Sequence, residues 1–196
     1  MSVLVGVLTL IFAMALNLPL ADQENQRQII TSKSQIDSAL IPWVEKINGT
    51  DKKYFVGKNL LIPKDTGWAK SYSPLPAYDS LLATRDSVIV VFLEKSLLGV
   101  YEHGCLMAWA PITRGRKVSF TPLGEYAVLD KARLMYSKKY GNVPMPYSLH
   151  LVDNICIHQG PMVGRGASHG CIRLFKRDAQ WLYTWARKGT KVIIKI

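Results

Sequence analysis

Short runs of apolar and β-branched residues dominate the sequence from Asp86 onward. Six of them stand at 88–93, 97–101, 105–110, 125–129, 147–152 and 155–158. Gly, Pro, Asp and Asn separate the runs, and TPLG at 121–124 places a proline at the second position of a turn. Because this spacing is typical of short strands joined by turns, residues 86–196 are predicted to form a predominantly β domain.

One amphipathic helix is predicted near the end of this domain. Its apolar face would consist of Ala179, Leu182, Tyr183 and Ala186. Asp178 precedes these residues as a candidate N-cap, and Gly189 follows as a helix terminator. Residues 192–196 then return to a strand pattern.

Residues 1–21 carry no charged side chain, and 3–16 form an almost unbroken apolar run of fourteen. That run is shorter than the about 20 residues needed to span a bilayer, so no integral membrane span is expected. Ala13-Met14-Ala15 matches a secretory cleavage pattern, and the sequence turns polar at 22–28. We predict a signal peptide at 1–21 and a protein exported to the periplasm or cell envelope. Because no Lys or Arg precedes the run, a buried helix remains the alternative.

A small N-terminal segment is predicted at 22–64. Ile41–Asn48 has a short amphipathic pattern, with Pro42 in the first turn and Gly49 directly after the end. Residues 54–63 indicate a turn and a short strand. Together these features predict a small α+β module.

Residues 43–63 weakly resemble the end of a LysM glycan-binding module. A segment that only packs against the rest of the chain is the alternative. Residues 65–85 contain Pro74 and Pro76 and are predicted to be a linker with turns.

The chain has a formal net charge of +11, from 25 basic and 14 acidic residues. Such a balance favours an anionic polymer or surface as partner. No nucleic-acid-binding motif accompanies the charge, so no nucleic-acid partner is expected. A basic surface that serves solubility is the alternative.

The stretch IHQGPMVGRGASHGCIRL at 157–174 concentrates the candidate catalytic residues. Two extended segments joined by a glycine-rich loop would place His158 beside Cys171. A histidine within hydrogen-bond reach of a thiol favours the thiolate, which is the nucleophilic form. Gly170 lacks a Cβ and would let a carbonyl group approach the main chain. The amides of Gly170 and Cys171 are candidate oxyanion donors.

Three other interpretations of this stretch compete. GASHG at 166–170 matches a serine nucleophile elbow, but no histidine follows His169 to complete that triad. Zinc could bind Cys156, His158, His169 and Cys171, although the usual ligand spacings are absent. In the third interpretation Cys171 is an inert, buried cysteine, which its polar sequence neighbours disfavour. No metal is expected, and no cofactor either, because no phosphate-binding glycine loop is present.

The motif SHGCIRL at 168–174, with IH upstream at 157–158, resembles the active-site motif of the L,D-transpeptidases. This YkuD-like family cross-links or decorates bacterial peptidoglycan. The resemblance covers most of 86–196 and includes TPLGEY at 121–126, MPY at 145–147 and the closing GTKVIIKI. It implies a mostly β, sandwich-like catalytic domain with one C-terminal helix, preceded by the small α+β N-terminal module.

The resemblance also implies roles for individual residues. Cys171 matches the acylated nucleophile and His158 the catalytic base. The positions that shape the oxyanion region are Ser168, His169 and Gly170. The substrate-binding candidates are Gln159, Gly160 and Arg173. Because the spacing from His158 to Ser168 is shorter than in many members, an abbreviated lid over the site is expected.

The implied activity is that of a transferase of peptidoglycan biosynthesis, with effects on cell wall organisation and cell shape. A stem tetrapeptide would acylate Cys171 as a thioester and lose its terminal D-Ala. The acceptor amine would come from a second stem peptide, a wall-anchored lipoprotein or a D-amino acid. A hydrolase of the same fold and a wall-binding protein without turnover are the alternatives. No S-x-x-K motif occurs, which argues against a serine penicillin-binding enzyme.

Three cysteines leave at least one thiol unpaired in an oxidising compartment. Cys156 precedes His158 by two residues, so both side chains share one face of a strand. Pairing of Cys156 with Cys171 would consume the nucleophile. Cys156 and Cys105 are therefore predicted to be reduced, packed residues.

Overall fold

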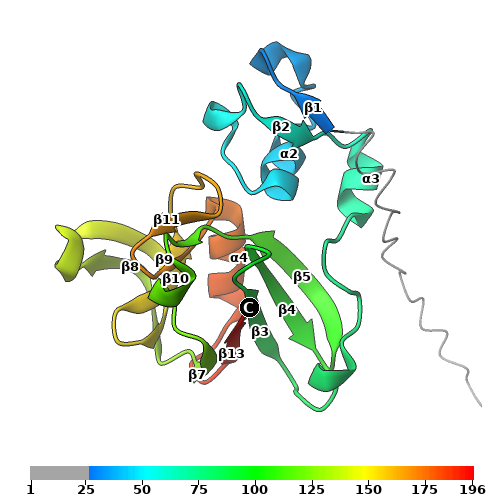
Figure 1. Ribbon diagram of the computed structural model, residues 1–196. Coiled ribbons are helices and arrows are strands. Elements are labelled where there is room, and N and C mark those ends of the chain that lie inside the picture. The colour runs from blue at the N-terminus through cyan, green and yellow to red at the C-terminus, as the bar shows by residue number, and fades with distance from the viewer. Residues whose placement is uncertain (1–26) are drawn as a thin grey trace, which may run out of the picture.

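The computed structural model describes residues 27–196, so the predicted signal peptide lies outside the described residues. Within the described range, no helix combines the length and the apolar character needed to cross a membrane. A small N-terminal module lies next to a larger β domain that is built around two sheets (Figure 1).

The first sheet has five strands in the order β5-β4-β3-β13-β7. They are β3 (Val88–Phe92), β4 (Leu97–Glu102), β5 (Cys105–Pro111), β7 (Gly124–Ala127) and β13 (Lys191–Lys195). Every residue of β3 is buried, as expected for an uninterrupted apolar run at the centre of a sheet. β13 pairs with β3 in parallel, so the last strand of the chain lies inside the sheet rather than at its edge.

The second sheet has four strands in the order β12-β10-β9-β8. They are β8 (Asp130–Ser137), β9 (Val143–Val152), β10 (Ile155–Gln159) and β12 (Ile172–Leu174). β10 and β12 are parallel, with Ile157 opposite Ile172 and His158 opposite Arg173. A two-stranded ribbon of β6 (Arg114–Gly115) and β11 (Gly166–Ser168) holds the intervening loop. This register brings the two ends of the IHQG…SHGCIRL stretch side by side.

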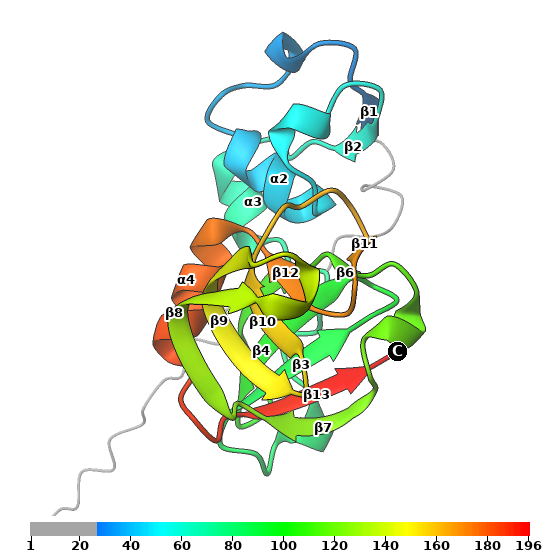
Figure 2. The same cartoon turned by 90° about the vertical axis from the view of Figure 1, so that its left-hand side faces the viewer.

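Apolar side chains of both sheets meet in one core, as the sandwich architecture requires. Ile89 from the first sheet and Ile157 from the second belong to the same buried cluster. Helix α4 (Lys176–Trp185) packs Ala179 and Leu182 into that cluster, and both views show it alongside the sheets (Figure 2). The predicted mostly β, sandwich-like domain with one C-terminal helix is confirmed.

Helix α4 begins earlier than its apolar periodicity indicates. Phe175 occupies the N-cap without a side-chain hydrogen bond, and Asp178 falls inside the first turn. The prediction of Asp178 as N-cap is therefore wrong. Its carboxylate still lies near the positive end of the helix dipole.

The N-terminal module has its own small core. Its elements are β1 (Arg27–Ile29), η1 (Lys33–Gln35), α2 (Ile41–Asn48), η2 (Lys52–Tyr54) and β2 (Asn59–Leu61). As predicted, Pro42 lies in the first turn of α2, and Gly49 ends the helix with a left-handed φ of 62°. The buried cluster consists of Ile30, Ile36, Val44, Phe55 and Leu60. The small α+β module is thus present, and glycan binding by it stays a prediction.

Residues 65–85 contain a helix that the sequence does not predict. Asp65 caps α3 (Thr66–Ser71), accepting a hydrogen bond of 2.7 Å from the Trp68 N–H. The η3 turn (Ser80–Leu82) follows. Leu75 and Leu82 are buried against the outer face of the five-stranded sheet. This segment therefore packs on the β domain over much of its length.

Candidate active site

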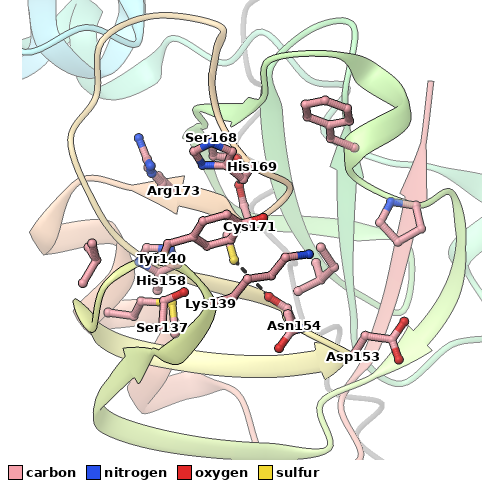
Figure 3. Close-up of a pocket in the computed structure, with 15 residues that line it drawn as sticks. Ser137, Lys139, Tyr140, Asp153, Asn154, His158, Ser168, His169, Cys171 and Arg173 are labelled. Carbon is pink, nitrogen blue, oxygen red and sulfur yellow. Dashed lines mark hydrogen bonds between the residues drawn. The ribbon is translucent and has the colours of Figure 1, made fainter.

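A cavity of about 580 Å³ opens beside the second sheet, under the hairpin 137–143 that joins β8 to β9. We call this hairpin the lid; it contains η5 (Lys138–Tyr140) and is not the 158–168 segment whose short spacing led us to expect an abbreviated lid. Five of the predicted site residues line the cavity: His158, Ser168, His169, Cys171 and Arg173. Figure 3 shows Lys139 and Tyr140 reaching toward Cys171 from the lid. The cavity thus unites the two ends of the predicted motif.

Cys171 and His158 form the reactive pair of this cavity. His158 lies in β10, and Cys171 directly precedes β12, the parallel neighbour of β10. The His158 Nδ1 lies 2.7 Å from the Gln159 carbonyl oxygen. Because a carbonyl can only accept, Nδ1 carries the proton and Nε2 is left as the base. His158 lines the same cavity and lowers the pKa of the Cys171 thiol, so the imidazole is placed to take the thiol proton.

The surroundings of Cys171 hold its pKa well below the ordinary thiol range. The main cause is a hydrogen bond from the Cys156 side chain, and His158 adds to it, while burial opposes both. In the neutral state the Cys171 thiol also donates to the Asn154 carbonyl oxygen at 3.3 Å (Figure 3). The site therefore favours a thiolate at neutral pH.

Ser168 fixes the loop that carries the nucleophile. Its hydroxyl donates to the Cys171 carbonyl oxygen at 2.6 Å and accepts from the Gly170 N–H at 3.0 Å. Thr121 donates to the Gly170 carbonyl oxygen at 2.8 Å. Gly170 has a φ of +137°, and a Cβ there would lie 2.6 Å from the Phe120 carbonyl oxygen, so only glycine is tolerated.

The Gly170 amide is not available to bind an oxyanion, because it donates to Ser168. The sequence-based suggestion that both Gly170 and Cys171 supply oxyanion donors therefore needs correction. The Cys171 N–H makes no hydrogen bond within residues 27–196 and remains the candidate donor.

His169 faces the lid. Its ring stacks on Tyr140 with a centroid distance of 4.4 Å and an interplanar angle of 19°. Tyr140 thereby connects the lid to the SHGC loop across the cavity.

Gln159 and Gly160 are absent from the described lining of the cavity. The Gln159 carbonyl instead orients His158. A Cβ on Gly160 would lie 2.8 Å from the Arg173 side chain, so glycine leaves room for Arg173. Both residues thus help to place His158 and Arg173, and their contact with substrate stays a prediction. Arg173 itself lines the cavity.

Several lining residues carry no sequence signal of their own. Asn154 follows Asp153 in the β9–β10 turn, where Asp153 has a left-handed φ of 45°. The lid residues Lys139 and Tyr140 lie in a polar segment without periodicity. The TPLG turn at 121–124 is visible in the sequence, but its contact with Gly170 is tertiary.

Within residues 27–196, no group of three or more His, Cys, Asp or Glu side chains is arranged to hold a metal ion. Because His169 stacks on the lid, it does not complete the zinc set considered from the sequence.

Comparison with known proteins places this geometry in a family. Residues 86–194 match the YkuD family, described as the L,D-transpeptidase catalytic domain. The chain belongs to this family. The match spans more than half of the chain and contains every residue of the cavity described above. The family assignment expected from the SHGCIRL motif is confirmed.

Two relatives carry L,D-transpeptidase names. The YkuD protein of Bacillus licheniformis is 28% identical over 116 residues, and L,D-transpeptidase 3 of Mycobacterium tuberculosis is 30% identical over 102 residues. These matches cover 54% and 43% of this chain and 64% and 38% of the relatives. The chain thus matches less than two thirds of either relative.

Solved structures share the fold. The L,D-transpeptidase of Xylanimonas cellulosilytica matches with a TM-score of 0.58 at 21% identity, covering 79% of this chain and 78% of that one. The Stackebrandtia nassauensis enzyme matches with a TM-score of 0.54 at 24% identity, covering 58% and 57%. At these identities the likeness concerns the fold alone.

Proposed function

We propose that this protein is a cysteine-dependent L,D-transpeptidase that acts on peptidoglycan stem tetrapeptides. The observation that carries the proposal is a solvent-connected cavity lined by both Cys171 and His158, in which a main-chain carbonyl holds the Nδ1 of His158. A nucleophile, a base and a group that orients the base are the parts that acyl transfer requires.

In the first half-reaction, His158 Nε2 takes the Cys171 proton and the sulfur attacks the carbonyl carbon before the terminal D-Ala. The Cys171 N–H stabilises the resulting oxyanion. When the intermediate collapses, the carbon–nitrogen bond breaks and His158 returns its proton to the amine of the leaving D-Ala. The donor peptide remains on Cys171 as a thioester.

In the second half-reaction an acceptor amine attacks the thioester carbonyl, and His158 removes a proton from that amine. The carbon–sulfur bond breaks and a new amide is released. A stem peptide, a lipoprotein lysine or a D-amino acid can each supply the amine. Attack by water instead would make the protein a hydrolase.

The charge of the cavity supports a carboxylate-bearing donor. Arg173 and Lys139 both line it, and Asp153 is its single acidic lining residue among those described. The net charge of +11 favours an anionic wall polymer. We propose that the protein meets this substrate in the periplasm or cell envelope after export.

Incubation of the protein with purified sacculi, followed by mass spectrometry of the muropeptides, tests the activity. We expect D-Ala release together with new cross-links or exchanged terminal residues, and neither product with Cys171→Ala. Tripeptides without any amide transfer would identify the hydrolase. Binding to sacculi without any product would identify a wall-binding protein and overturn the proposal.

A further inference from the structure

Cys156 is a buried nucleophilic group that the mechanism above does not use. It lies in β10 with only 2% of its surface exposed. The parallel register of β10 and β12 pairs Ile157 with Ile172. One residue earlier, the same register sets Cys156 opposite Cys171. Because side chains alternate along a strand, Cys156 also shares the face of His158.

The contacts of Cys171 change when its thiol ionises. The neutral thiol donates to the Asn154 carbonyl oxygen at 3.3 Å. A thiolate has no proton to donate, so the sulfur and the Asn154 carbonyl oxygen are then both hydrogen-bond acceptors and no longer bond to each other. The thiolate needs donors instead. Cys156 is placed to supply one, because its buried side chain lies opposite Cys171 in the register of β10 and β12 and on the face of His158. Its side chain is also the main cause of the lowered pKa of Cys171.

Other groups around Cys171 do not replace Cys156 as a donor. His158 becomes a donor only after it has taken the proton. Arg173 lies opposite His158 on β12, and Lys139 and Tyr140 belong to the lid. The remaining titratable groups that line the cavity are His169 and Asp153, and the His169 ring is stacked on Tyr140.

We propose that Cys156 is a positioning residue, whose buried thiol donates a hydrogen bond to the Cys171 thiolate and holds that sulfur beside His158. The inference rests on the proposed function of Cys171 as the nucleophile. Its chemistry is suited to the role, because the hydrogen bond to Cys171 and burial together raise the pKa of Cys156. Cys156 therefore keeps its proton while Cys171 loses its own.

Alkylation kinetics measure this effect directly. The rate of iodoacetamide addition to Cys171, followed against pH and assigned by peptide mapping, gives the pKa of that thiol. In Cys156→Ala we expect this pKa to rise by about one unit, or roughly tenfold in the thiolate-to-thiol ratio, since a thiol is a weak donor to a charged acceptor. Cys156→Ser keeps a donor and should restore most of the shift.

Cys105→Ala is the matched control. It removes the same chemical group from β5, in the other sheet and outside the cavity lining, and should leave the pKa of Cys171 unchanged. Equal titration of Cys171 in the wild type, Cys156→Ala and Cys156→Ser would overturn the proposal. Alkylation needs no peptidoglycan, so this outcome is independent of whether transpeptidation occurs.

Infrared spectroscopy of the unsubstituted protein covers the case in which Cys156→Ala does not fold. The S–H stretching band of Cys156 should move to lower frequency as Cys171 ionises, while the band of Cys105 stays in place. A Cys156 band that does not respond to the ionisation of Cys171 would contradict the proposed hydrogen bond.

Discussion

Ser168 holds the active-site loop through a single hydroxyl group. That hydroxyl is buried and serves the Gly170 amide and the Cys171 carbonyl at once. Because a buried polar group without a partner costs more than a hydrogen bond gains, loss of this hydroxyl would leave both of its main-chain partners unsatisfied. The position of the Cys171 backbone, and thus of its sulfur, follows from it.

Removal of the Ser168 hydroxyl should destabilise the protein and slow acylation together. Ser168→Ala leaves a donor and an acceptor unpaired, which should lower the free energy of unfolding by about 2 kcal/mol. Ser137→Ala is the control, because Ser137 lines the same cavity and its hydroxyl makes no capping hydrogen bond. Denaturant unfolding and thiol acylation rates measure both effects. Equal behaviour of the two variants would refute this role.

At the scale of elements, the parallel pair β10–β12 positions His158 and Cys171, and the lid covers the cavity that these residues line. The sequence predicts β10, the glycine-rich return and the extended segment after it, because apolar runs and glycines mark them. It predicts no element at 130–137, because the sequence of β8, DKARLMYS, lacks the regular alternation of polar and apolar residues that marks a half-exposed strand. Sequence patterns therefore predict neither the lid nor the stacking of Tyr140 on His169.

The stack of Tyr140 on His169 should keep the lid closed over the donor peptide. Tyr140→Ala removes a contact between rings of about 0.5–1.5 kcal/mol, so we expect KM to rise about fivefold and amide exchange to accelerate at 138–142. Tyr136→Ala, on the exposed face of β8, should change neither. Similar exchange in both variants would show that the stack does not restrain the lid.

The sequence predicts the site residues that lie in one motif and misses those that come together only through strand pairing. Cys171, His158, Ser168 and Arg173 are found because they share one motif. The donor role of Cys156 and the contact of Thr121 with Gly170 arise only when distant strands pair. A motif predicts the reactive residues. The groups that orient those residues are brought to them by the register of paired strands, which the motif does not contain.

At the scale of the whole molecule, the N-terminal module and the β domain meet at a second pocket of about 300 Å³. Lys46 from α2 and Asp178 from α4 both line it. Burial raises the pKa of Asp178, and the charges of Lys46 and Arg177 only partly oppose this. One Asp178 carboxylate oxygen, Oδ2, has no hydrogen-bond partner within the described residues.

Asp178→Asn should therefore stabilise the protein at neutral pH. A raised carboxyl pKa means that folding penalises the charged form, a penalty that is present at pH 7 and absent below the unfolded pKa of about 3.9. We expect a higher melting temperature than wild type at pH 7 and no difference near pH 3. Asp86→Asn, at an exposed carboxylate, should have no effect at either pH. A pH-independent gain for Asp178→Asn would contradict this account.

All three cysteines are free in the structure, and protein purified without reductant should keep all three thiols reduced. Thiol counting in denaturant should give three titratable groups. A single group would show that two cysteines are bridged, and peptide mapping would then reveal whether the bridge joins Cys156 to Cys171.

The central claim is that Cys171 is acylated with the help of His158. Intact-mass spectrometry after mixing with a carbapenem, a reactive acylating β-lactam, tests it most directly. We predict one adduct per chain on the wild type and on Cys105→Ala, none on Cys171→Ala, and acylation slowed about 10²–10⁴-fold in His158→Ala. Because the pKa of Cys171 is lowered, the wild-type rate should hold at pH values well below the ordinary thiol pKa of about 8.5. An adduct of equal yield on Cys171→Ala would contradict the account.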